Sequence, residues 1–345
     1  MRATIAALPA AVMLLAACSD GSAGATSPGT PATTAAAASP SASPQAAHHA
    51  SSPGIVAVTT GGALVLLNQS TGAAARTLVP SGVIGDEISV APDGSTVYFV
   101  THHGGCQDEI ESVPASGGSP VRITPGQYPA VSPDGTKLAF AAEPSLTIGC
   151  VPSGSNLTAQ YKLVVRTLST GSQAVFPLNP ASQASGLPAP ISHLSWARDS
   201  TQLAVSISQV EDNEGWAVVL VDTAAAAYYE GGTGDTTVPV TGSPRAPDSY
   251  YREGVFLPDG NLFVSRACCT GIPVKNTSRL MWEVDISGAQ VHQVAIGYPA
   301  LEHTSLDVSG SGRWLLYLAG NDLYVSRSGR TPAKLAGGLV AAAWM

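Results

Sequence analysis

One position recurs in the sequence with residues that could do chemistry. A phrase related to Ser-Pro-Asp-Gly occurs five times, and the residue four places before its first residue is equivalent in each copy. With an incomplete sixth copy at the end of the chain, this position holds Glu87, Tyr128, His193, Glu253, Ser305 and Ala341. Carboxylates, an imidazole and a phenol that converge could coordinate a divalent cation such as Ca²⁺, with Glu87, His193 and Glu253 as ligands, or bind a polar ligand. Sequence neighbours could extend the site: Asp86, Gln127, Arg252 and His303.

Other kinds of catalytic centre find little support in the sequence. No Gly-x-Ser-x-Gly nucleophile motif occurs. A second metal hypothesis rests on His102, His103 and Cys106, which lie close together on one predicted loop, but no second tight ligand pair follows. Catalysis would therefore have to use the recurring position.

Each copy of the phrase predicts a β-hairpin, because apolar runs flank it. Ile88–Val90 precedes the first copy and Val97–Val100 follows it. Proline fixes φ at the second turn position, and Asp and Gly accept the conformations that follow. The last copy departs from the pattern, with Gly310-Ser311-Gly312 in place of Pro-Asp-Gly.

Further apolar runs after each hairpin raise the count to four strands per unit, which is one blade of a β-propeller. Five units follow from the five phrases, and the two ends of the region supply a sixth. Ile55–Val79 resembles the second to fourth strands of a blade, and Leu339–Trp344 resembles a first strand. We therefore predict an all-β domain over residues 55–345, a six-bladed propeller of four-stranded antiparallel blades. The C-terminal strand would close the ring by pairing with the N-terminal blade.

The Ser-Pro-Asp-Gly phrase followed by an aliphatic strand is similar to the repeat of TolB-type propellers, which are WD40-like, over nearly all of residues 55–345. The resemblance implies a periplasmic or surface binding scaffold more often than an enzyme. The recurring position would then ring one mouth of the central channel, where polar residues also occur simply because the channel is wet. Some six-bladed propellers are cation-dependent lactonases or esterases, which keeps a hydrolase alternative open. Fold alone does not decide between them.

The N-terminus predicts export and lipidation. Residues 1–17 form a signal peptide with a short apolar core, and Leu15-Ala16-Ala17-Cys18 resembles the lipobox of bacterial lipoproteins, in which the cysteine receives lipid. Residues 18–54 are rich in Ala, Ser, Thr and Pro, so they predict a disordered tether. The expected location is extracytoplasmic, on the bacterial cell membrane through the lipid alone.

Four further cysteines would meet oxidising conditions after export, which favours disulfides. Cys106 and Cys150 fall after the second strands of consecutive predicted blades and could be bridged. Cys268 and Cys269 would then form a vicinal pair. Either pairing would act as a structural staple.

Charge and composition narrow the partners. The net charge is −8 and no run of Lys or Arg occurs, which argues against nucleic acid. We expect a monomeric, non-catalytic binding module for an envelope protein or glycan. Tyr251, Arg252 and His303 join the recurring position as ligand-binding candidates, because aromatic residues beside Arg suit a recognition surface.

Overall fold

The computed structural model describes residues 54–102, 108–142, 162–177, 191–209, 215–223, 249–268, 281–285, 290–294, 303–327 and 331–345. Within these ranges the chain forms 23 strands in six antiparallel sheets. None of the described residues forms a helix long and apolar enough to cross a membrane.

Each sheet is one blade, and the blades follow the chain. Blade 1 combines the first three strands with the last, in the order β23-β1-β2-β3: β23 (Leu339–Trp344), β1 (Ile55–Thr59), β2 (Leu64–Leu67) and β3 (Ala74–Val79). Blade 2 is β4 (Val83–Val90), β5 (Thr96–His102), β6 (Asp108–Pro114) and β7 (Val121–Pro125). Blade 3 is β8 (Gln127–Val131), β9 (Lys137–Ala142), β10 (Lys162–Thr167) and β11 (Gln173–Pro177).

The second half repeats the pattern. Blade 4 has three described strands, β12 (Ile191–Trp196), β13 (Gln202–Gln209) and β14 (Gly215–Asp222); residues 224–248 lie outside the described part. Blade 5 is β15 (Ser249–Phe256), β16 (Leu262–Cys268), β17 (Met281–Val284) and β18 (Gln290–Val294). Blade 6 is β19 (His303–Val308), β20 (Trp314–Ala319), β21 (Asp322–Arg327) and β22 (Ala333–Gly337). The predicted six-bladed, all-β fold is therefore confirmed.

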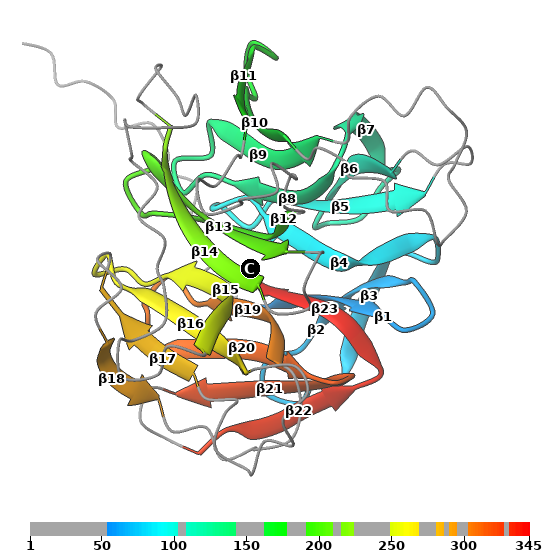
Figure 1. The fold of residues 1–345 in the computed structure, drawn as a ribbon. Helices are drawn as coiled ribbons and strands as arrows, with labels where there is room; N and C mark the ends of the chain where they lie inside the picture. Colours follow the sequence, from blue (N-terminus) through cyan, green and yellow to red (C-terminus); the bar gives the residue numbers. More distant parts are fainter. Residues whose placement is uncertain are drawn as a thin grey trace, which may run out of the picture. The chain divides into compact units, whose positions relative to one another are not determined.

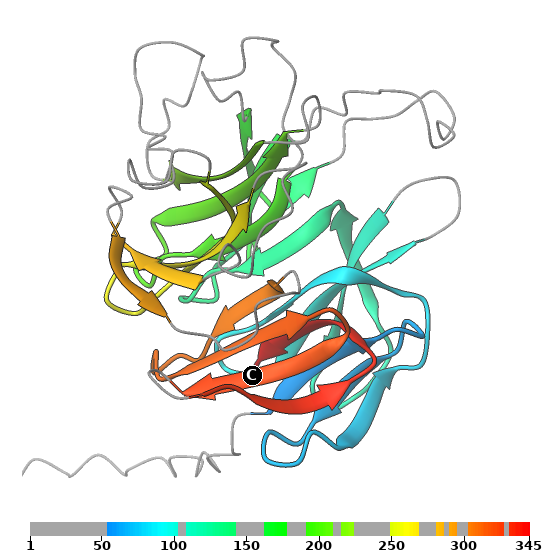
Figure 2. The same ribbon diagram turned by 60° about the horizontal axis from the view of Figure 1, so that its bottom comes forward.

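The ring closes through β23, as the sequence predicted. Ile55 pairs with Trp344, and the antiparallel register continues through Val58 and Ala341. The N–H of Met345 also donates to the carbonyl of Gly54 at 2.9 Å. Figures 1 and 2 both show the red strand β23 beside the blue strands of blade 1. Closure removes an open sheet edge that β1 would otherwise present.

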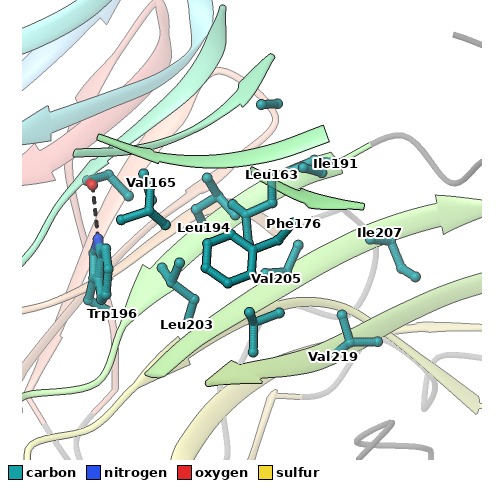
Figure 3. Packing of buried hydrophobic residues seen from close by; sticks show 14 residues of the cluster. Leu163, Val165, Phe176, Ile191, Leu194, Trp196, Leu203, Val205, Ile207 and Val219 are labelled. Carbon is teal, nitrogen blue, oxygen red and sulfur yellow. Dashed lines mark hydrogen bonds between the residues drawn. The ribbon is translucent and has the colours of Figure 1, made fainter. Parts of the chain in front are cut away.

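The hydrophobic core lies between neighbouring blades. The largest cluster joins blades 3 and 4: Leu163 and Phe176 pack with Leu194, Leu203 and Val219, all buried (Figure 3). At one end of this cluster the indole Nε1 of Trp196 donates to the carbonyl of Ala130 at 2.9 Å. Strands such as β1, β5 and β9 are buried over four or more consecutive residues, so that each blade supplies one face to each of its two neighbouring layers.

The hairpin turns share one conformation. The side chains of Asp93, Asp134, Asp199 and Asp259 each accept a hydrogen bond, of 2.9 to 3.0 Å, from the N–H two residues later. The residue after the aspartate is in the left-handed region, with φ of 70° at Gly94 and 71° at Gly135. Blade 4 has Ser200 at this position, with φ of 60°. The Ser200 side chain compensates by accepting a 3.1 Å hydrogen bond from the N–H of Asp134 in the preceding blade.

Candidate ligand pocket in the channel

The innermost strand of each blade is irregular near the recurring position. Tyr128 and Ser305 occupy this position in blades 3 and 6, and both have positive φ, 52° and 51°. The pairing of each innermost strand also shifts register there, in the pairs β4–β5, β8–β9, β12–β13, β15–β16, β19–β20 and β23–β1. Such bulges re-aim side chains and commonly lie beside functional sites. The repeated phrase thus marks a bulge as well as a turn.

Beyond the bulges, toward the hairpin turns, the six innermost strands surround a pocket of about 360 Å³. Each of these strands contributes lining residues, so the pocket occupies the end of the central channel on the turn side. Its polar lining includes Ser89, His193, Ser195, Ser305 and Asp307. Trp196 and Trp344 supply aromatic surface from blades 4 and 1, which lie opposite each other in a ring of six.

At every second junction around the ring, two neighbouring blades are joined at the pocket by an equivalent hydrogen bond. The hydroxyl of Ser89 accepts from the N–H of Val131 at 2.9 Å, and that of Ser195 accepts from the N–H of Phe256 at 3.0 Å. The third member is a carboxylate: Oδ2 of Asp307 accepts from the N–H of Trp344 at 2.7 Å. All three acceptors lie two places before the first residue of their phrase. The other three blades have the apolar residues Ala130, Val255 and Ala343 there.

Asp307 on the pocket wall has a shifted pKa. Its other oxygen, Oδ1, accepts from the N–H of Val308 at 2.7 Å. Burial raises the pKa of Asp307 to about 6, although the N–H groups of Trp344 and Val308 and the nearby His193 each lower it. A carboxyl group with a shifted pKa on the wall of a pocket is a candidate for ligand recognition.

The residues at the recurring position lie in different surroundings. His193 is 8 % exposed and lines the pocket together with Ser305. Glu253 is buried, and its Oε2 accepts a 3.2 Å hydrogen bond from the N–H of Leu306, which joins blade 5 to blade 6. Tyr128 packs, partly buried, against the cluster between blades 3 and 4. His193 is therefore the ionisable candidate that the structure brings into the pocket.

Several other candidates lie outside what the structure describes. For Asp86, Glu87, Tyr251, Arg252, Cys268 and His303 the backbone is described but the side chain is not. Cys18, His103, Cys106, Cys150 and Cys269 lie wholly outside the described ranges, as do the signal peptide and the tether up to residue 53. Lipidation and both disulfide pairings therefore remain predictions.

His102, part of the second metal hypothesis, pairs with a carboxylate. Its Nδ1 lies 3.0 Å from Oδ1 of Asp108, and Gln127 donates to the other oxygen, Oδ2. Within the described ranges, three or more His, Cys, Asp or Glu side chains nowhere gather as they would around a metal ion.

Asp307 was not among the residues that the repeat pattern singled out, although the sequence contains a signal for it. Among the six residues two places before the first residue of the phrase, Asp307 alone is ionisable. Its hydrogen bond to the closing strand depends on the spacing of blades 6 and 1 and could not be read from the pattern.

Comparison with known proteins identifies the architecture. No family model matches the chain, and no curated protein matches it. Among solved structures, TolB from Acinetobacter baumannii superposes with a TM-score of 0.58 at 16 % identity, over 85 % of this chain and 66 % of TolB. The chain thus matches just under two thirds of that TolB. A putative TolB from Agrobacterium tumefaciens gives 0.52 at 14 % identity, over 84 % of this chain and 91 % of the other.

A third structure shows how widely this architecture is shared. Hydrazine synthase from Kuenenia stuttgartiensis gives a TM-score of 0.51 at 10 % identity, over 79 % of this chain and 76 % of that one. Likeness at such identities establishes the fold and leaves function to the site. The chain therefore folds as a six-bladed β-propeller of the TolB type.

Proposed function

We propose that the chain is a non-catalytic binding module of the bacterial cell envelope, anchored through lipid on Cys18. Its channel pocket would receive part of a protein or glycan partner. The observation that carries this proposal is the pocket itself, which all six innermost strands enclose. Its volume of about 360 Å³ falls in the range of small-ligand sites, about 300–1,000 Å³.

The lining supports recognition more than reaction. The hydroxyls of Ser89 and Ser195 already accept hydrogen bonds from neighbouring blades, so they hold the pocket in shape. The carboxylate of Glu253, a cation-ligand candidate of the hydrolase alternative, likewise binds a backbone N–H. These bonds give a rigid rim, and rigidity lowers the entropic cost of binding.

The proposal is tested by obstructing the pocket without disturbing the fold. Gly310 lies on the pocket wall, is exposed, and would place a Cβ with no atom within 4 Å. In Gly310→Trp the added indole should therefore obstruct the pocket at little cost to the stability of the fold. Gly61→Trp is the matched control: Gly61 is also exposed, its nearest contact would be Thr59 Oγ1 at 3.8 Å, and it is not part of the pocket wall.

Affinity capture from envelopes of the producing bacterium, with analysis of both proteins and glycans, gives the readout. We expect a partner that the parent chain and Gly61→Trp both retain and that Gly310→Trp loses at least tenfold, which is about 1.4 kcal/mol. Equal recovery by Gly310→Trp would place recognition away from the pocket. The absence of any partner above an unrelated lipoprotein control would contradict the binding role.

A further inference from the structure

The charge of the pocket is one-sided. Among its described lining residues Asp307 is the single carboxylate, and neither Lys nor Arg is present. The two hydrogen bonds that the structure gives its oxygens come from neutral backbone N–H groups. His193 is an ionisable group that lowers the pKa of Asp307. A partly buried carboxylate with neutral donors and an imidazole leaves room for a stronger positive partner.

The surroundings of Asp307 also suit a cation. Trp344, whose N–H binds Asp307, contributes to the pocket wall together with Trp196 from the opposite blade. The indole of Trp196 already makes a cation–π contact, because the ammonium Nζ of Lys137 lies 5.6 Å from the centre of the indole ring. Indole surface beside a carboxylate is a combination that recognises amines and guanidinium groups.

We propose that the pocket recognises a cationic group of the partner, an amine or a guanidinium, which binds at the carboxylate of Asp307. This inference rests on the proposed function, because it names the chemistry that the pocket selects. A partner without such a group would cover the partly exposed carboxylate of Asp307 without supplying a positive charge, so the pocket discriminates against neutral and acidic ligands.

The protonation of Asp307 gives the proposal a second signature. Its pKa of about 6 means that a cation bound to the carboxylate must displace a proton when the pH lies below that value. The strands packed against β19 are β15, β20 and β23. β23 carries no ionisable residue, and β20 carries the buried Tyr317. β15 carries Glu253, which accepts from the N–H of Leu306, together with Tyr250, Tyr251 and Arg252. The side chains of these last three, and of His303 on β19 itself, lie outside the described part. His193 on β12 of blade 4 also acts on Asp307, and Arg313 is in the exposed turn before β20. Across the channel, β8 carries no ionisable residue besides Tyr128. On β4 the ionisable residues are Asp86 and Glu87, and the structure describes neither of their side chains.

The test compares two small probes of nearly equal shape by calorimetry on the purified full chain. Nα-acetyl-arginine amide carries a guanidinium, and Nα-acetyl-citrulline amide carries a neutral urea in its place. At pH ~8, where Asp307 is ionised, we expect the arginine probe to bind at least tenfold more tightly. At pH ~5 the preference should shrink severalfold, and binding should release close to one proton.

Two variants test whether the preference for the arginine probe depends on Asp307. Asp307→Asn should abolish the preference and its pH dependence, whereas Asp322→Asn, at a partly exposed carboxylate paired with Lys334, should retain both. Equal binding of the two probes by the parent chain would overturn the proposal, as would the absence of millimolar binding by either. Proton release by the parent chain keeps the test decisive if Asp307→Asn fails to fold. A partner captured through the pocket without any arginine preference would leave the proposed function standing and remove only the cation specificity.

Discussion

Asp307 in blade 6 accepts a 2.7 Å hydrogen bond from the backbone N–H of Trp344 on the closing strand. The equivalent bonds between other blades use the hydroxyls of Ser89 and Ser195. At the one junction where the two ends of the propeller meet, the acceptor is ionisable. Closure of the ring and the charge of the pocket are thus tied to the same carboxyl group.

The first prediction concerns the pH dependence of stability. Because the pKa of Asp307 is raised from 3.8 to about 6 in the folded chain, its contribution is complete below the unfolded value and is lost as the pH rises through about 6. At 1.36 kcal/mol per pKa unit, the full effect is about 3 kcal/mol. Denaturant titrations between pH ~4 and pH ~7 should show the free energy of unfolding falling more steeply for the parent chain than for Asp307→Asn. Parallel curves for the two proteins would contradict the assignment.

The turn aspartates act in the opposite direction at lower pH. Hydrogen bonds from Ser95 and Thr201 lower the pKa of Asp93 and Asp199. Their contributions are present above the unfolded value of 3.8 and are lost as the pH falls through their folded values. The comparison with Asp307→Asn is therefore made above this range, where these aspartates stay ionised.

A second prediction concerns the fit of blade 2 against the closing strand. A Cβ at Gly85 on β4 would lie 2.1 Å from Cγ2 of Val340 on β23. Gly85→Ala should destabilise the chain by about 1–3 kcal/mol because of this overlap, and Val340→Ala should remove most of the penalty. The coupling is measured by thermal or denaturant unfolding of the two single variants and the double variant. Gly310→Ala, which meets no neighbour, is the control. Additive effects in the double variant would show that β23 does not pack on Gly85.

The third prediction separates strain from hydrogen bonding at Ser200. Ser200→Gly removes the side chain from a φ of 60° but loses the acceptor for the N–H of Asp134. Ser200→Ala loses the same acceptor and keeps the unfavourable backbone conformation. We expect Ser200→Ala to be less stable than Ser200→Gly by about 1 kcal/mol, measured by chemical denaturation. The reverse order would mean that the backbone strain at this turn is small.

A fourth prediction tests the anchor. Cells making the parent chain should incorporate labelled palmitate into it and retain it in the membrane fraction, whereas Cys18→Ala should do neither. Two or more acyl chains are needed for stable attachment, which is the reason for expecting complete release. Membrane retention of Cys18→Ala without label would indicate a different mode of attachment.

Much of the architecture could be predicted because each blade has the same short sequence pattern of strand, turn and strand. The Pro-Asp-Gly turns at Asp93 and Asp134 have the chemistry that the hairpins require. The closing strand was recognisable because Leu339–Trp344 matches the strand that precedes each turn. The hairpin also forms where Ser200 replaces Gly, and the Ser200 hydroxyl accepts a hydrogen bond from the turn of the preceding blade.

The site was harder to predict because it depends on distances between blades. Of the residues at the recurring position, His193 lines the pocket, whereas Glu253 accepts a hydrogen bond from a neighbouring strand, a contact that no pattern along the chain reveals. Asp307 lies two places before a turn in which both Pro and Asp are replaced, so a search for intact copies of the phrase does not find it. Comparing one column across all blades, including degraded ones, would have found it.

The position of β1 determines how the propeller carries mechanical load. Because β23 and β2 flank β1 on both sides, a pull on the chain at Gly54 acts on an interior strand of its sheet. To extract β1, such a force must shear two ladders of hydrogen bonds at once, since both run along the direction of pulling. An edge strand at the same place could be peeled away one bond at a time. The closed ring is therefore built to resist tension that enters through its own N-terminal end.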